Sequence, residues 1–378
     1  MSLGSYYDVI IIGGGLAGLS AAIHLRKYEF NILLIEKNDY PKHKVCGEYI
    51  SNEVLPYLNY LGIDVFALGA KNITKFEVST IQNKLISADL PMGGFGISRY
   101  TLDYALYSKA IEIGVLVLQD TVGDVHFLED EFKVSTKNNG QLCSKIVIGS
   151  YGKRTNLDVK LNRKFIKNKS PYLAVKTHVK GDFPNDIVAL HNFDGGYCGV
   201  SKVEDDSINL CYITNFEAFK KHKDIDEFQE KVLFKNAYLK SIFENTNPVF
   251  QAPLTISQIS FDRKSPVEQH MLMCGDSAGM IHPLCGNGMS MAIRSAQIAS
   301  ELIIDYLNKK IISRDVLEAA YQKAWNKAFQ FRLKVGHVVA NLFNNSTLSE
   351  ISLRIFKIMP FVIPLIIKQT HGKPMSIK

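Results

Sequence analysis

The stretch Val9-Ile-Ile-Ile-Gly13-Gly-Gly15-Leu-Ala-Gly18 decides the fold of this chain. It joins an apolar, β-branched run, typical of a buried strand, to a Gly-x-Gly-x-x-Gly turn that opens a helix. The first glycine permits the tight turn, the second lets backbone N–H groups approach a pyrophosphate, and the third lets helix and strand pack closely. We therefore predict a dinucleotide site at the start of the chain.

A second apolar run, Asn31-Ile-Leu-Leu-Ile-Glu36, ends in an acidic residue 18 positions after Gly18. A carboxylate at this place accepts hydrogen bonds from both hydroxyls of a ribose, which favours an unphosphorylated ribose such as that of FAD or NAD. Strand, helix and strand in this order form the βαβ unit of a parallel sheet. The sequence thus predicts a Rossmann-like nucleotide-binding domain.

Length and composition limit the classes of protein. The chain has 378 residues, 46% of them hydrophobic and 21% charged, which predicts a large core and two or three structural units. The net charge of +7 is scattered, so nucleic-acid binding has no support. Six dispersed cysteines without zinc-site spacing predict reduced thiols and no metal. With no signal-peptide pattern and no long apolar window, we expect a cytoplasmic protein.

The pattern along the chain predicts an α/β fold in three parts. Short alternating runs between residues 174 and 213, separated by Gly, Asp and Asn turns, predict a separate antiparallel sheet. Helical spacing predicts a helix from Ser98, its cap, to Ile113. Further helices are expected over 226–239, 288–307, 316–344 and 348–368, the last interrupted by Pro360 and Pro364.

A second glycine-rich stretch lies far along the chain, in Cys274-Gly-Asp-Ser-Ala-Gly-Met-Ile-His-Pro-Leu-Cys-Gly-Asn-Gly-Met-Ser-Met-Ala-Ile-Arg294. It combines a carboxylate, Asp276, on a glycine-flanked turn with Pro283 and a Gly-x-Gly pair at the start of a long helix. Such a turn presents its carboxylate to a polyol and points free N–H groups at an anionic or electron-rich ring.

This stretch resembles the flavoprotein hydroxylases of the p-hydroxybenzoate hydroxylase class and, more closely, the geranylgeranyl reductase family. Both carry a Gly-Asp-(Ser/Ala)-Ala…Pro…Gly-x-Gly signature over the ribityl chain and isoalloxazine of FAD. The resemblance implies that Asp276 binds the ribityl hydroxyls and that Pro283 and residues 286–289 line the flavin. We expect an FAD-binding domain made of residues 1–72, 95–165 and 265–310. An antiparallel substrate domain is expected over 73–94 and 166–264, and a helical C-terminus over 311–378.

Three further places match these families. Lys44-Val-Cys46-Gly-Glu48 resembles a Lys-x-Cys-Gly-Gly/Glu stretch of the reductases in which the cysteine lies close to the flavin face. Arg99 matches an arginine that begins a helix and reaches the cofactor, and Val122 matches a position whose backbone meets adenine or is plain core. The predicted cofactor residues are Gly13, Gly15, Leu16, Ala17, Gly18, Glu36, Lys37, Lys44, Cys46, Arg99, Val122, Gly275, Asp276, Pro283, Gly286, Asn287, Gly288 and Met289.

The sequence also departs from these families. Tyr151 stands where the hydroxylases carry the aspartate of an Asp-Gly pair linked to FAD and NAD(P)H binding. The substrate-sheet stretch Gly195-Gly-Tyr197-Cys-Gly-Val-Ser201 keeps only the Gly-Tyr part of the reductase pattern. Trp325 is the single tryptophan, so the Trp-x-Trp-x-Ile-Pro signature of the common flavin halogenases is missing.

We therefore predict an FAD-dependent oxidoreductase, a reductase or dehydrogenase that transfers hydride between flavin N5 and a lipophilic, isoprenoid or polyene-like substrate. Cys46 and Tyr197 are the predicted catalytic residues, as proton donors. Two alternatives stay open: a flavin monooxygenase that hydroxylates an aromatic or polyketide substrate, and a non-catalytic FAD electron-transfer protein. The electron donor is NAD(P)H or a reduced protein.

The C-terminal stretch 351–367 is unusually apolar. It predicts one of three arrangements: peripheral contact with the inner face of the membrane, a cap over an apolar pocket, or a buried terminal helix.

Overall fold

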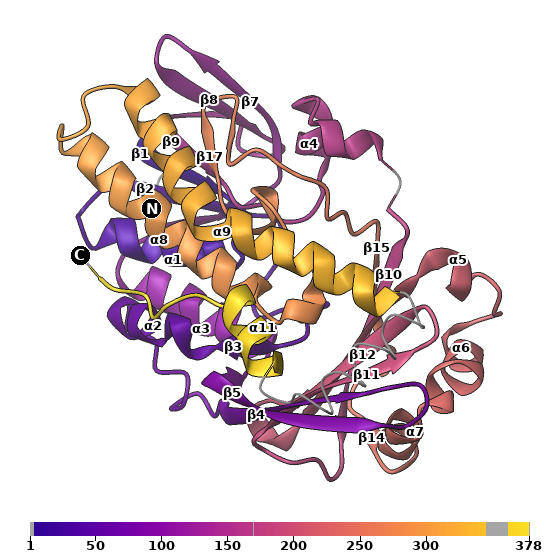
Figure 1. The fold of residues 1–378 in the computed structure, drawn as a ribbon. Helices are drawn as coiled ribbons and strands as arrows, with labels where there is room; N and C mark the ends of the chain where they lie inside the picture. The colour runs from indigo at the N-terminus through magenta and orange to yellow at the C-terminus, as the bar shows by residue number, and fades with distance from the viewer. Residues whose placement is uncertain (1–3, 169, 345–361, 378) are drawn as a thin grey trace.

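The computed structural model describes residues 4–168, 170–344 and 362–377 of the chain. They form two β-sheets, with helices beside the first sheet, between the sheets and on the outer side of the second (Figure 1). The predicted α/β class, with a Rossmann-like part and a second sheet, is confirmed.

The first sheet has eight strands and contains the predicted βαβ unit. β1 (Tyr6–Ile12) lies in its centre, parallel to β2 (Ile32–Glu36) on one side and β9 (Gln141–Gly149) on the other. β1 is almost wholly buried, as its apolar run predicts. The remaining strands are β6 (Leu116–Gln119) beside β2, β17 (Met271–Met273) beside β9, β16 (Val267–Glu268) at the edge, and the hairpin of β7 (Val122–Leu128) and β8 (Glu131–Thr136).

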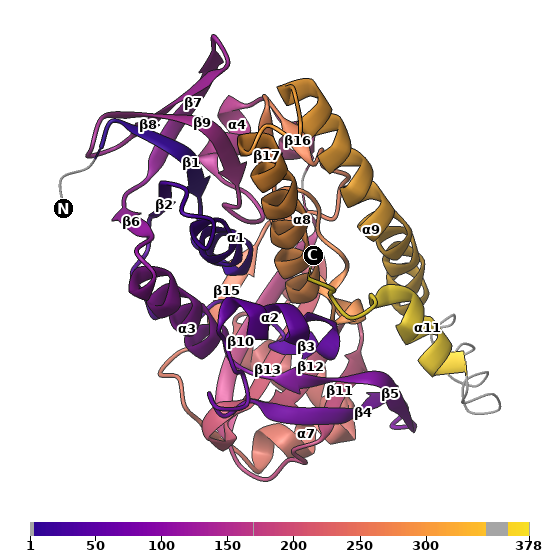
Figure 2. The ribbon, with the colours of Figure 1, turned by 90° about the vertical axis from the view of Figure 1, so that its left-hand side faces the viewer.

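Helices cover this sheet and join it to the C-terminal part of the chain. α8 (Gly288–Leu307) lies between α1 (Leu16–Arg26) and the long α9 (Arg314–Asn344) (Figure 2). The hydroxyl of Ser98 accepts a hydrogen bond from the backbone of Thr101 and so caps α3 (Arg99–Glu112), as predicted. The short helices of this part are α2 (Leu55–Leu61) and α4 (Asn156–Lys160).

The second sheet has nine strands, in the order β14-β10-β13-β12-β11-β4-β5-β3, with β15 also paired to β10. β4 pairs in parallel with β11, and the other pairings are antiparallel. The strands are β3 (Tyr49–Ser51), β4 (Lys71–Ser79), β5 (Leu85–Gly96), β10 (Tyr172–Lys180), β11 (Ile187–Phe193), β12 (Gly196–Lys202), β13 (Ile208–Asn215), β14 (Asn247–Pro248) and β15 (Leu254–Ser257).

The chain passes between the two sheets more than once. β3 lies within the range 1–72 predicted for the cofactor domain, yet it pairs with β5 in the second sheet. This crossing brings the segment before β3 up against the second sheet. The bounds of the three predicted parts stay a prediction.

The helix predicted over 226–239 is wrong as one element. The structure has α6 (Ile225–Lys231) and α7 (Ala237–Glu244), after α5 (Phe216–Phe219), and the chain turns at Asn236. The Asn236 side chain donates to Ser79 Oγ at 2.8 Å and to the Asn192 carbonyl at 3.0 Å. Its amide oxygen accepts from Tyr238 N, so it caps α7. Hydrogen bonds to the second sheet therefore interrupt the helix that the apolar periodicity predicts.

The C-terminal helix also differs from its prediction. Pro364 lies inside α11 (Val362–Thr370) and does not interrupt it. Ile363 of this helix is buried against Val78 and Ile86 of the second sheet. The predicted interruption at Pro360, most of the helix predicted over 348–368 and most of the apolar stretch 351–367 lie outside the described residues. Among the helices that the structure describes, none has the length and apolar character to cross a bilayer.

Buried histidines make the stability of this fold depend on pH. Burial, together with Lys27, lowers the pKa of His24 from 6.5 to about 4, and burial does the same for His191. Between these pH values the unfolded chain binds protons that the folded chain does not. The free energy of unfolding should therefore fall as the pH drops from about 6.5 to about 4.

His24→Gln removes one group that takes up a proton on unfolding. The slope of the free energy of unfolding against pH should therefore decrease by the equivalent of about one proton. The measurement is urea unfolding across this pH range, with His126→Gln as the control because the His126 side chain is 69% exposed. Equal pH slopes for the two variants would contradict the assignment.

Candidate functional site

A cavity of about 750 Å³ opens where the ends of β1 and β2 meet the second sheet and α11. It brings together residues from both ends of the chain. Tyr197 and all the predicted cofactor residues except Gly18 and Val122 line it: Gly13, Gly15, Leu16, Ala17, Glu36, Lys37, Lys44, Cys46, Arg99, Gly275, Asp276, Pro283, Gly286, Asn287, Gly288 and Met289. The roles of these residues stay predictions.

Two glycines at the turn after β1 have no room for a side chain. Gly13 has a φ of +102°, and a Cβ on it would lie 2.5 Å from the Ser150 carbonyl oxygen. A Cβ on Gly18 would lie 2.0 Å from the Gly13 carbonyl oxygen, so Gly18 does not reach the cavity but lets α1 pack against the turn. Among the described side chains none caps the N-terminus of α1. Its first N–H groups therefore face the cavity without a side-chain acceptor.

Glu36 stands at the end of β2 beside this turn. Its Oε2 accepts the backbone N–H of Gly14 at 2.7 Å, and its Oε1 accepts the backbone N–H of Asn38 at 3.0 Å. These bonds fix the carboxylate at the wall of the cavity. Oε1 also accepts from Asn38 Nδ2 at 2.6 Å, so Oε2 is the oxygen that keeps a lone pair for a hydroxyl of a ligand.

The second glycine-rich stretch forms the opposite wall. Gly275 and Gly286 both have positive φ, +61° and +60°, so the chain turns sharply on each side of Pro283. α8 then begins at Gly288, and no described side chain caps its N-terminus either. Two helix N-termini thus open onto one cavity, one from each end of the chain.

These features fit FAD. A glycine cradle with an uncapped helix suits a pyrophosphate, Glu36 suits a ribose, and the Asp276 carboxylate and the start of α8 suit the ribityl chain and the flavin. Lys264 secures the Asp276 turn, because its ammonium donates to the carbonyls of Asp276 at 2.7 Å and Lys153 at 2.8 Å. Burial lowers the pKa of Lys264 to about 8.

A buried carboxylate fixes Arg99 and Lys44 at the cavity. Asp103 accepts two hydrogen bonds from the Arg99 guanidinium, at 2.7 and 2.8 Å, and one from Lys44 at 2.8 Å. Burial opposes the charged form of Asp103, but the two cations outweigh it and hold its pKa below the ordinary value. Asp103 therefore keeps the Arg99 and Lys44 side chains in place without help from a ligand.

The loop 44–48 is held by a buried charged cluster that the sequence analysis missed. We call Glu48, Lys176 and His178 the Glu48 cluster. The Glu48 carboxylate pairs with the Lys176 ammonium and lies 2.7 Å from His178 Nε2, and Glu48 and Lys176 are fully buried. Burial would raise the pKa of Glu48, but the hydrogen bond from His178 and the charge of Lys176 lower it below its ordinary value.

Further contacts join this loop to the second sheet. Lys176 also donates to the Lys44 carbonyl at 3.2 Å, and Asn209 donates to the carbonyl of Gly47 at 2.9 Å. A signal for these residues exists in Ala174-Val-Lys-Thr-His-Val179, where Lys176 and His178 share one face of an otherwise apolar strand. Their partner, Glu48, is far away in the sequence and could not be identified from it.

The two predicted catalytic residues lie on different walls of the cavity. Cys46 Sγ is 3.5 Å from Met289 Sδ, beside the start of α8. Tyr197, on β12, is buried, and its hydroxyl has no hydrogen-bond partner among the described residues. Burial raises the pKa of Tyr197 well above its ordinary value, so the hydroxyl keeps its proton at neutral pH.

Val122 is not brought to the cavity. It begins β7, pairs with Thr136 of β8 and packs partly against the main core. The register shifts directly after it, between Val122 and Asp124. Its contact with adenine stays a prediction, and so does the alternative, a core position.

We predict that Lys176→Met lowers the free energy of unfolding by about 3 to 5 kcal/mol, because it leaves a buried carboxylate without its cation. Urea unfolding of the single variant and of Lys176→Met/Glu48→Gln measures this effect, and the double variant should lose less. Lys231→Met removes a lysine from an exposed pair with Glu227 and should change nothing measurable. A double variant as unstable as the single one would contradict the buried pairing.

Part of the chain matches a known protein family, and known proteins resemble the chain in sequence. A family model described as FAD-dependent oxidoreductase matches residues 8–47. The digeranylgeranylglycerophospholipid reductase of Methanosarcina acetivorans is 24% identical over 356 residues, which cover 90% of this chain and 85% of that protein.

Two solved structures share the fold. The flavin-dependent brominase Bmp2 has a TM-score of 0.79 at 20% identity, with 96% of this chain and 93% of that chain covered. A geranylgeranyl bacteriochlorophyll reductase-like protein from Thermoplasma acidophilum has a TM-score of 0.73 at 18% identity, with 92% and 90% covered. The family match, the relatives and the cofactor cradle identify the chain as an FAD-dependent oxidoreductase.

Proposed function

We propose that the chain is a reductase or dehydrogenase that exchanges hydride between FAD and a lipophilic, isoprenoid or polyene-like substrate. FAD bound in the cradle supplies the hydride chemistry. One observation carries the proposal: the cavity that holds the cradle continues into an apolar arm between the second sheet and α11.

The apolar arm is defined by side chains of β4, β5, β11, α9 and α11. Val188 and Leu190 of β11 stand on one side, and Ile366 and Ile367 of α11 stand on the other. Such a lining favours a ligand with little polarity, since a buried polar group needs a hydrogen-bond partner. The arm is lined by Phe76, Val78, Leu90, Val188, Leu190, Val339, Ile363, Ile366 and Ile367.

Reduction of a carbon–carbon double bond needs one hydride and one proton. We assign that proton to Tyr197 or Cys46, because both line the cavity. The external electron donor in this proposal is NAD(P)H or a reduced protein.

The relative named digeranylgeranylglycerophospholipid reductase supports this reading, because it is similar over most of both chains. The likeness to the brominase concerns the fold. Hydroxylation or halogenation of a substrate would both consume oxygen, whereas reduction of a double bond does not. Oxygen dependence therefore separates these reactions.

The test begins with the FAD-loaded protein, photoreduced without oxygen and mixed with a geranylgeranyl glycerolipid. We expect the absorbance of oxidised FAD to return and mass spectrometry to find product with two added hydrogens per reduced bond. A product that forms only with oxygen, and carries a hydroxyl or a halogen instead, would replace the reductase by a monooxygenase or halogenase.

Filling the apolar arm should impair turnover of the substrate but not the binding of FAD. Val188→Trp places a bulky ring in the arm, so we expect kcat/KM for the isoprenoid to fall about tenfold or more while FAD stays bound. Val159→Trp is the matched control, because Val159 is 53% exposed on α4. The measurements are steady-state kinetics and the flavin absorbance of the purified variants. Unchanged kinetics for Val188→Trp would place the substrate elsewhere.

A further inference from the structure

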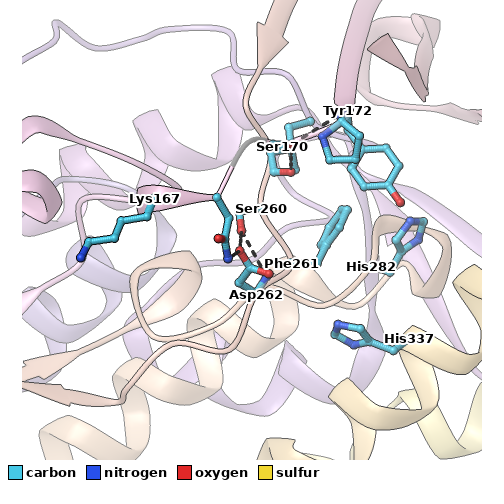
Figure 3. A pocket seen from close by; sticks show the side chains of 11 residues that line it. Lys167, Ser170, Tyr172, Ser260, Phe261, Asp262, His282 and His337 are labelled. Carbon is cyan, nitrogen blue, oxygen red and sulfur yellow. Dashed lines mark hydrogen bonds between the residues drawn. The ribbon is translucent and has the colours of Figure 1, made fainter. Parts of the chain in front are cut away.

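A second cavity, of about 550 Å³, lies between the start of β10, the segment after β15, and α9. Figure 3 shows Lys167 at one end of it and the rings of His282 and His337 at the other. A cation, Lys167, and a carboxylate, Asp262, both line this cavity, so its charge favours no one class of ligand. The turn after β1, by contrast, has side-chain contacts that the βαβ order alone does not require.

Two side chains hold the backbone of Gly14, in the middle of this turn. The Glu36 carboxylate accepts its N–H at 2.7 Å, and the Tyr40 hydroxyl donates to its carbonyl oxygen at 2.5 Å. A Cβ on Gly14 would lie 1.8 Å from the Tyr40 oxygen. The absence of a side chain at Gly14 therefore makes room for the Tyr40 hydroxyl.

Tyr40 is itself held in place. Its ring stacks on the ring of Tyr107 on α3, with centroids 4.3 Å apart and planes inclined by 11°. Burial and the neighbouring Glu36 carboxylate raise the pKa of Tyr40 above its ordinary value. The hydroxyl therefore keeps its proton at neutral pH and is a fixed, uncharged donor to the Gly14 carbonyl.

This donor determines which way the peptide between Gly14 and Gly15 faces. The C=O and N–H groups of a planar trans peptide point in opposite directions. Gly13 and Gly15 line the cofactor cavity, whereas neither Gly14 nor Tyr40 belongs to its described lining. Because the Gly14 carbonyl is bound to Tyr40 behind the cavity wall, the Gly15 N–H is directed into the cavity. There it lies at the start of α1, where a pyrophosphate fits.

The backbone of the turn does not fix this orientation by itself, because both residues that flank the peptide are glycines. Turning the peptide over would bring the φ of Gly15 from −86° to a positive value, which glycine adopts at no steric cost. The Gly14 carbonyl oxygen, with its partial negative charge, would then face the pyrophosphate. A peptide fixed in advance avoids this arrangement and needs no reordering when the anion binds.

We propose that Tyr40 is a positioning residue for the pyrophosphate of the cofactor. Its hydroxyl holds the Gly14 carbonyl away from the cavity and so presents the Gly15 N–H to a phosphate oxygen. Tyr40 acts through the backbone and does not touch the cofactor. The inference rests on the binding of FAD and not on the proposed reaction or substrate.

The test is the affinity of the full-length apoprotein for FAD, measured by isothermal titration calorimetry. Tyr40→Phe keeps the ring and its stack on Tyr107 but removes the hydroxyl. We expect the Kd for FAD to rise about five- to tenfold, as for the loss of one hydrogen bond. The Kd for riboflavin, which has no phosphate, should not change.

Tyr107→Phe is the matched control, because it removes a hydroxyl from the ring stacked on Tyr40 and leaves the bond to Gly14 in place. It should leave the Kd for FAD unchanged. An unchanged Kd for FAD in Tyr40→Phe, the same rise in Tyr107→Phe, or an equal rise for riboflavin would overturn the role of Tyr40. Failure of the unsubstituted protein to bind FAD would instead overturn the cofactor assignment itself, so the two failures are distinguishable.

Discussion

The Glu48 carboxylate is the constraint on which the site depends. It joins three parts of the chain, because it pairs with Lys176 of β10, contacts His178 and accepts the backbone N–H of Arg99 at 2.8 Å. A carboxylate without charge partners at this depth would be strongly unfavourable. The cluster therefore holds the loop 44–48 against the second sheet and the start of α3, and so determines where Cys46, Lys44 and Arg99 stand.

The sequence was sufficient for features that depend on near neighbours. The turn at Gly13, the close approach at Gly18 and the acidic end of β2 follow from local backbone geometry and from the βαβ order. The Glu48 cluster and the break at Asn236 depend on partners far away in the chain. The Asn236 side chain, for example, bonds to Ser79 and Asn192, and no periodicity of its own segment encodes that.

The comparisons show that proteins with different named activities share this fold. A reductase-like protein and a brominase share this fold at 20% identity or less, so the fold alone does not select the reaction. In this chain the cradle and the apolar arm form one cavity but come from different elements: the cradle from turns of the first sheet, the arm from the second sheet and α11.

The walls of the cavity come from both ends of the chain. Gly13 to Ala17 lie near the beginning, residues 275–289 lie far along it, and Ile366 to His371 close the other side. During synthesis the nucleotide turn leaves the ribosome long before its opposite wall exists. A nascent chain therefore has an incomplete cofactor cavity until residue 371 has emerged from the exit tunnel, however early β1 and α1 fold.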